Sequence, residues 1–213
     1  MTKLGSALLL TVLGISLAGQ VLAYSVRPAC PSAETTEYFV PAGVLEPDRP
    51  DSDAFVRAWY SKHLRVMGEP SLSCGQTAEA ESYRFTWLRT FNRPVSVRIV
   101  RDAVGVRLVA VELTGAGGYD PGTIATRTEK RISGVDWQVL SAALSKASFW
   151  RMPTRPTEPT VGLDGSQWIV EGRRGRGEYH IVDRWTPRRG GYRDAGLTFL
   201  TLAGISATGD DLY

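Results

Sequence analysis

Residues Leu163 to Trp185 decide the fold of this protein, and they read LDGSQWIVEGRRGRGEYHIVDRW. Side chains alternate in character from Ser166 to Glu171 and again from Glu178 onward, which is the period of a β-strand. The glycines between the two runs allow the positive φ angles that a tight loop needs. The stretch therefore predicts two antiparallel strands joined by a loop of glycine and arginine.

The register of this hairpin follows if Gly172 and Gly177 face each other. Trp168 then lies opposite Ile181, and Tyr179 lies on the same face. Aromatic and β-branched cross-strand pairs of this kind stabilise a sheet by up to roughly 1 kcal/mol each. We expect this face to pack against the core.

On the opposite face, the same register makes Glu171 and Glu178 direct neighbours. Two carboxylates that face each other across a sheet repel, and this repulsion raises the pKa of one of them. One carboxyl group can then act as an acid and the other as a base. The candidate catalytic residues are therefore Glu171, Glu178, Asp183 and His180. The alternative is that nearby arginines neutralise these acidic side chains at the surface, so that they have no catalytic role.

Arginines gather in the hairpin loop and after the second strand, at Arg173, Arg174, Arg176, Arg184, Arg188, Arg189 and Arg193. Guanidinium groups suit carboxylate and phosphate partners, so the cluster favours binding of an acidic ligand or protein. No aromatic residue interleaves the loop arginines, which argues against nucleic acid as a partner. The alternative is a solvated loop that keeps the hairpin soluble.

Residues 1–23 have the features of a secretory signal peptide. Lys3 supplies the positive charge near the N-terminus, and an apolar run follows it. The segment ends with Val-Leu-Ala, and the small residue Ala23 suits a cleavage site. The apolar run is short for a membrane span. We expect a mature chain from Tyr24 that is periplasmic or secreted, with an uncleaved signal as its sole route to a membrane.

The two cysteines, Cys30 and Cys74, both lie in the expected mature chain. A pair of cysteines in an exported protein predicts one disulfide bond, because export compartments are oxidising. The bond would close a long loop and stabilise the fold by roughly 4 kcal/mol in the chain-entropy model.

The rest of the chain predicts one domain behind a proline-rich arm. The sequence has 213 residues and a formal net charge of +3, so it is nearly balanced. Residues 24–50 are rich in proline and lack periodicity, and residues 51–213 form the expected single domain. Residues 51–68 repeat apolar side chains at helical spacing.

Strand patterns then follow one another at residues 83–89, 95–101, 104–114 and 123–132, with a polar last strand suited to a sheet edge. Consecutive strands without an intervening helix favour an antiparallel meander. Residues 134–147 and 192–205 predict two more helices, the first with a buried stripe that includes Val135, Val139 and Leu140. We predict an α+β fold: an antiparallel sheet of five or more strands with helices packed on one face.

Several common chemistries lack their motifs. The glycine-rich turn at 115–122 has no phosphate-loop pattern and leads into a strand. No G-x-S-x-G elbow and no H-x-x-x-H pair occurs, so we expect neither a serine nucleophile nor a metal or other cofactor. His63 fits the edge of a core face better than a catalytic role.

Three short patterns are similar to ones in exported Gram-negative bacterial proteins of unassigned function. They are LDGxxWxxEG at 163–172, YHxVDRWxP at 179–187 and YRxxGL at 192–197. The resemblance covers about a quarter of the chain and carries no catalytic motif, so it implies a bacterial envelope setting and no mechanism.

The expected function is that of an exported binding or accessory protein, whose partner is an unidentified protein or acidic ligand of the envelope. One alternative is a hydrolase-like enzyme that uses the hairpin carboxylates, and another is a structural component of an envelope assembly. The binding hypothesis predicts an exposed patch of arginine and aromatic side chains. The enzyme hypothesis predicts a concave pocket that holds Glu171, Glu178 or Asp183.

Overall fold

The computed structural model describes residues 39–74, 80–157, 162, 164–175 and 177–207. All of them belong to one compact unit, Pro31–Tyr213, and the other unit is Met1–Cys30. The predicted signal peptide, Cys30 and Arg176 lie outside the described residues. Cleavage at Tyr24 and the disulfide bond to Cys74 therefore stay predictions.

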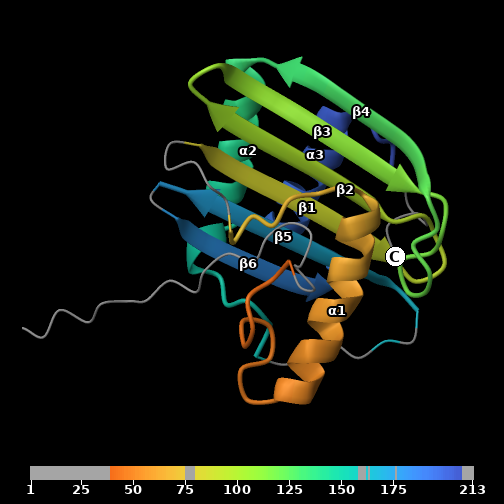
Figure 1. The fold of residues 1–213 in the computed structure, drawn as a ribbon. Coiled ribbons are helices and arrows are strands. Elements are labelled where there is room, and N and C mark those ends of the chain that lie inside the picture. The colour runs from red at the N-terminus through yellow and green to blue at the C-terminus, as the bar shows by residue number, and fades with distance from the viewer. Residues whose placement is uncertain (1–38, 75–79, 158–161, 163, 176, 208–213) are drawn as a thin grey trace, which may run out of the picture. The chain divides into compact units, whose positions relative to one another are not determined.

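The described residues form a six-stranded antiparallel sheet with the strand order β4-β3-β2-β1-β5-β6 (Figure 1). The strands are β1 (Glu81–Arg89), β2 (Val95–Asp102), β3 (Gly105–Leu113), β4 (Ile124–Ile132), β5 (Ser166–Arg174) and β6 (Glu178–Trp185). The predicted meander and hairpin are both confirmed, and so is the α+β class. Polar β4 is an edge strand, as its sequence predicts.

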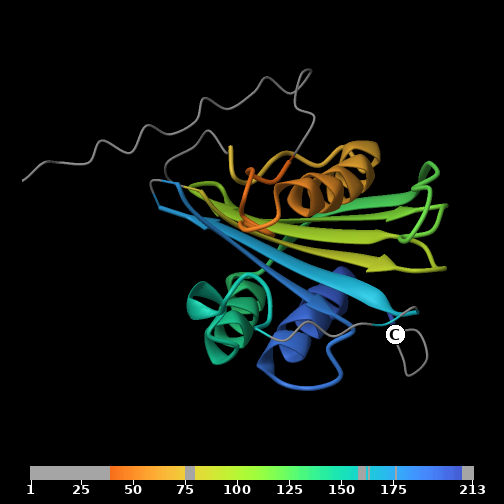
Figure 2. The same cartoon turned by 90° about the horizontal axis from the view of Figure 1, so that it is seen from below.

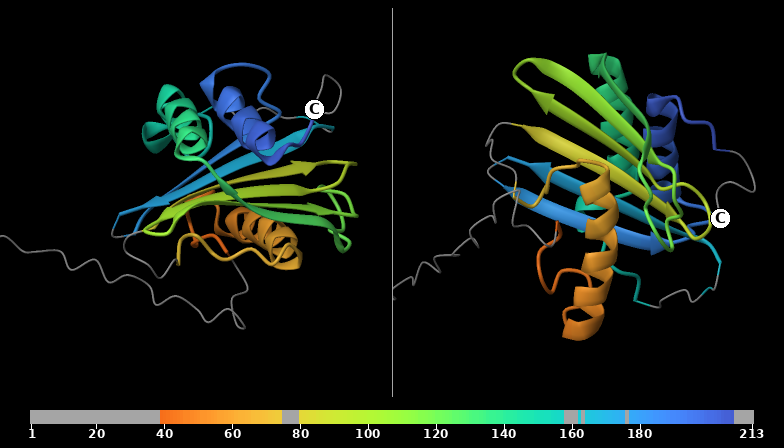
Figure 3. Two further views of the ribbon diagram at one scale, coloured as in Figure 1. Left: turned by 90° about the horizontal axis from the view of Figure 1, so that it is seen from above. Right: turned by 45° about the vertical axis from the view of Figure 1, so that its right-hand side comes forward.

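Three α-helices cover the sheet: α1 (Pro50–Val66), α2 (Gly134–Lys146) and α3 (Gly191–Ala203), with the short 3-10 helix η1 (Phe149–Arg151) after α2. The structure differs from the expectation that they share one face. α1 lies on one face, whereas α2 and α3 lie on the other (Figures 2 and 3). The reason lies in β1 and β5, which are buried on both faces and therefore need cover on both.

The larger core fills the space between the sheet and the α2–α3 pair. Phe85 and Trp168 meet there with ring centroids 5.1 Å apart, and Phe199 of α3 stacks on Phe85. A Cβ on Gly196 would lie 2.4 Å from the Trp168 ring, so glycine at this position lets α3 approach the sheet. This close packing joins α3 to β1 and β5.

The buried stripe of α2 differs from the predicted one. Trp137, Leu140 and Leu144 face the core, whereas Val135 and Val139 are 66% and 50% exposed. An indole buries more apolar area than a valine side chain does, so the helix is turned to place Trp137 inside.

The β5–β6 hairpin is confirmed, but its predicted register is wrong. Arg174 pairs with Glu178 across the ladder, so the loop runs from Gly175 to Gly177. These two glycines have φ angles of 54° and 99°, the left-handed region that glycine adopts without strain. The loop is therefore shorter than a pairing of Gly172 with Gly177 requires.

Gly172 lies within β5 because a ring occupies the space that a side chain would need. A Cβ there would lie 2.6 Å from the Phe149 ring. The changed register places Ile181 opposite Glu171. Ile181 therefore lies on the α1 face, whereas Trp168 lies in the core beneath α2 and α3.

The α1 face of the sheet combines apolar contacts with buried polar groups. Tyr60 of α1 packs with Leu88 and Ile169, and Leu64 packs nearby with Val109. Residues 39–50, part of the expected arm, also pack here through buried apolar side chains. None of the helices among the described residues combines the length and hydrophobicity of a membrane span.

Candidate functional site

The two glutamates of the predicted acid–base pair do not face each other. Glu171 is buried, and its Oε1 accepts a hydrogen bond from the Tyr179 hydroxyl at 2.9 Å. Glu178 is exposed and pairs with Arg174 at 2.8 Å. The hypothesis of a carboxylate pair at these positions is therefore wrong, because the register on which it depends differs.

Glu171 belongs instead to a buried ionic network. Arg84 is fully buried and donates from Nε to Glu171 at 2.8 Å. Its Nη1 lies 3.4 Å from Glu69, which also accepts from Arg98 Nε at 2.7 Å. Burial disfavours the Arg84 charge, but Glu171 and Glu69 outweigh it and raise the pKa of Arg84. The network ties the segment after α1 to strands β1, β2 and β5.

Within the described part of the hairpin loop, the arginines do not form an exposed cluster. Arg173 is buried. The Arg174 guanidinium lies 4.1 Å from the centre of the Trp150 ring and pairs with Glu178, so its charge is already matched. Arg176 lies outside the described residues.

The remaining arginines of the predicted cluster lie toward the other end of β6. Arg184 is half-buried and donates to the backbone carbonyls of residues 153 and 154. Arg188 and Arg189 are exposed in the loop after β6, and Arg193 lies on α3. Because β6 separates these residues from the hairpin loop, the structure does not bring the described members of the predicted set together on one surface.

Both histidine side chains make contacts within the fold. His63 is buried, with Nδ1 3.0 Å from the Trp59 carbonyl, and burial lowers its pKa. The His180 ring packs against Phe149, and burial lowers its pKa as well. Among the described residues, no three His, Cys, Asp or Glu side chains lie close enough together to hold a metal ion.

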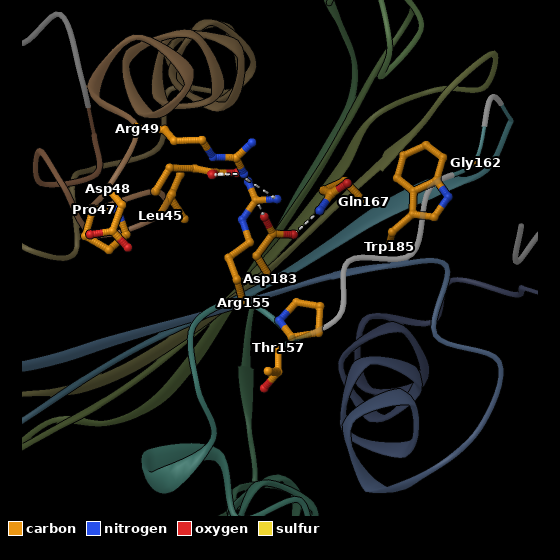
Figure 4. Close-up of a pocket in the computed structure, with 12 residues that line it drawn as sticks. Leu45, Pro47, Asp48, Arg49, Arg155, Thr157, Gly162, Gln167, Asp183 and Trp185 are labelled. Carbon is orange, nitrogen blue, oxygen red and sulfur yellow. Dashed lines mark hydrogen bonds and ion pairs between the residues drawn. The ribbon is translucent and has the colours of Figure 1, made fainter.

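A pocket of about 510 Å³ lies where residues 45–49, residues 155–157 and the ends of β5 and β6 meet (Figure 4). Its apolar lining includes Leu45, Pro47 and Trp185. Its polar lining includes Asp183 of the predicted catalytic set, together with Gln167. Of the four predicted catalytic residues, Asp183 is the one that lines this pocket.

Asp183 is fully buried at the floor of this pocket. Its Oδ2 accepts a hydrogen bond from the Tyr60 hydroxyl at 2.7 Å and lies 3.1 Å from Arg155 Nη2. Its Oδ1 accepts from Gln167 Nε2. Burial raises the pKa of Asp183, although Arg155, Gln167 and Tyr60 all favour its charged form.

Residues 45–49 form the wall of the pocket that faces Asp183, and the first turn of α1 holds them in place. Asp53 of this turn accepts hydrogen bonds from the backbone amides of Leu45 and Glu46 at 3.1 Å each. Glu46 is thereby held where Arg155 Nη1 comes within 3.7 Å of it. Arg155 therefore lies between two carboxylates, those of Glu46 and Asp183.

Trp185 forms a separate aromatic wall beside Gly162, apart from the Arg155–Asp183 pair (Figure 4). A Cβ on Gly162 would lie 2.5 Å from its indole nitrogen, so glycine is required at this approach. The next residue, Thr186, has a φ of 40°, which is strained for a β-branched side chain. Its hydroxyl accepts from the Ser166 amide at 2.9 Å. Strain of this kind is concentrated at binding and catalytic sites.

The comparisons with known proteins add no family. A scan against protein-family models finds no match, and a search of curated proteins finds no similar sequence. The class of this protein therefore rests on its fold and on the geometry of the pocket.

Proposed function

We propose that this is an exported binding protein of a bacterial envelope, periplasmic or secreted, that holds a small ligand in the Asp183 pocket. The observation that carries the proposal is a fully buried carboxylate at the floor of a pocket of about 510 Å³. Pockets that bind small molecules typically have volumes of roughly 300–1,000 Å³ and combine apolar walls with a few convergent polar groups.

The pocket supports small-molecule binding better than the arginine surface expected from the sequence supports a protein partner. Asp183, Tyr60 and Gln167 are joined by hydrogen bonds and lie on packed elements, so the polar floor is rigid. Of the hairpin-loop arginines that the structure describes, Arg174 is paired with Glu178 and Arg173 is buried.

A second candidate function is an enzyme in which Asp183 acts as a general acid. The raised pKa of this carboxyl, caused by burial, favours it, because catalytic acids are often tuned in this way. Binding remains the better-supported function, because both Asp183 oxygens already accept hydrogen bonds and Arg155 lies against Oδ2. Conversion of a bound compound by the wild type, but not by Asp183→Asn, would favour the enzyme.

The test is a crystal structure of the protein grown with a small-molecule extract of the bacterial envelope. We expect ligand density in contact with Asp183 or with the side chains that surround it. Ligand density elsewhere, with water alone in this pocket, would overturn the proposed site.

A further inference from the structure

The charge balance of the pocket favours a positively charged ligand group. Among the described residues, the charged side chains that line it are three acids and two arginines: Glu46, Asp48, Asp183, Arg49 and Arg155. Three negative charges against two positive charges leave one net negative charge. Arg49 is 69% exposed and pairs with Glu46 at the rim, whereas Arg155 reaches the buried floor.

Arg155 fills the most buried cation position of the pocket, but it does so poorly. Its Nη2 lies 3.1 Å from Asp183, and its Nη1 lies 3.7 Å from Glu46, beyond hydrogen-bond distance. Its Nε is buried and has no hydrogen-bond partner among the described residues. A guanidinium group that fits its site makes paired hydrogen bonds to carboxylates, and this one does not.

Resting on the proposed function, we propose that the pocket binds the guanidinium group of a ligand, which takes the place of the Arg155 side chain between Asp183 and Glu46. The side chain of Arg155 is 31% exposed, so it has a route into solvent. Arg155 thus acts as an internal competitor that occupies the site when the ligand is absent.

Replacement of Arg155 by the ligand requires the Arg155 side chain to move, but the backbone stays in place. The Asp183 amide donates to the carbonyl of Thr154 at 2.8 Å, and Arg184 Nη1 donates to the same carbonyl at 2.8 Å. These bonds hold the chain beside Arg155 against β6. The ligand guanidinium meets the Asp183 carboxylate in the position that Arg155 leaves, and Trp185, which lies apart from this position, lines the pocket for the rest of the ligand.

The experiment measures the binding of L-arginine and L-citrulline by isothermal titration calorimetry. The two probes have nearly the same shape, but the urea group of citrulline is neutral. Wild-type protein is expected to bind arginine and not citrulline. Arg155→Ala is expected to bind arginine at least about tenfold more tightly, because the internal competitor is gone.

Arg49→Ala is the matched control, because it removes the same charge from the same pocket but leaves the Arg155–Asp183 pair intact. A general electrostatic effect would strengthen arginine binding equally in both variants. This outcome would contradict the proposal that the ligand replaces the Arg155 side chain. Thermal unfolding is the second readout. Arginine should raise the melting temperature of Arg155→Ala, and citrulline should not.

The guanidinium group can belong to a free small molecule or to an arginine side chain of a polypeptide. The capped tripeptide acetyl-Gly-Arg-Gly-amide distinguishes the two sources, since tighter binding of the tripeptide than of free arginine assigns a polypeptide. If wild type and Arg155→Ala bind no guanidinium probe, the inference is wrong. The proposed function still stands if the crystals show another compound in the pocket, and it fails with the inference if they show none.

Discussion

Arg84 is a fully buried charge on the α1 face of the sheet. It lies between Glu171 and Glu69 with no exposed surface. Arg84→Met should lower the free energy of unfolding by about 3–5 kcal/mol, because it leaves buried carboxylates without a partner. Chemical denaturation of the purified protein measures this loss.

Arg107→Met is the matched control for that measurement. Arg107 also lies on a strand and pairs with a glutamate, Glu129, at 3.6 Å, but both side chains are about half exposed. Its loss should cost less than about 1 kcal/mol, because solvent screens exposed pairs. Equal losses in the two variants would contradict a structural role for the buried network.

At the same scale, the sequence identified one residue of the candidate site and missed its partners. Asp183 was a candidate because it is an acid on a strand of the hairpin. Tyr60, which donates to it, lies 123 positions away in the sequence. Arg155 comes from a proline-rich connection that has no periodicity. Such long-range contacts depend on the order of strands in the sheet, and local sequence patterns do not predict that order.

At the scale of elements, the strands and helices were predictable because their periodicities are strong, and the hairpin register was not. Several glycines lie between the two strand patterns, and each offers a different closing pair. The choice depends on Gly172, whose missing side chain makes room for Phe149, a residue outside the hairpin. The paired-glutamate hypothesis failed for this reason.

The rotation of α2 gives a direct test of the packing on its face of the sheet. Leu140→Ala should destabilise the protein by about 2–5 kcal/mol, because this side chain is fully buried. Val139→Ala, its neighbour, should change stability by less than about 0.5 kcal/mol, because Val139 is half exposed. Thermal or chemical denaturation compares the two variants, and a larger effect at Val139 would contradict the observed rotation.

At the scale of the whole described unit, the position of β5 creates the site. The first four strands pair with their neighbours in sequence, but β5 returns after α2 to pair with β1. This places the end of β6 beside residues 45–49, where the pocket lies. The sequence predicted the strands of this sheet without predicting that return, so it could indicate Asp183 without indicating the pocket.

The measurement that tests the central claim most directly is native mass spectrometry of the protein purified from the envelope fraction of a Gram-negative host. We expect the mass of a chain that begins at Tyr24 together with one bound small molecule, which Asp183→Asn should lose. Asp194→Asn, an exposed site with the same change, should keep it. Wild-type protein without a bound compound, or a compound that both variants retain, would contradict a binding site at Asp183.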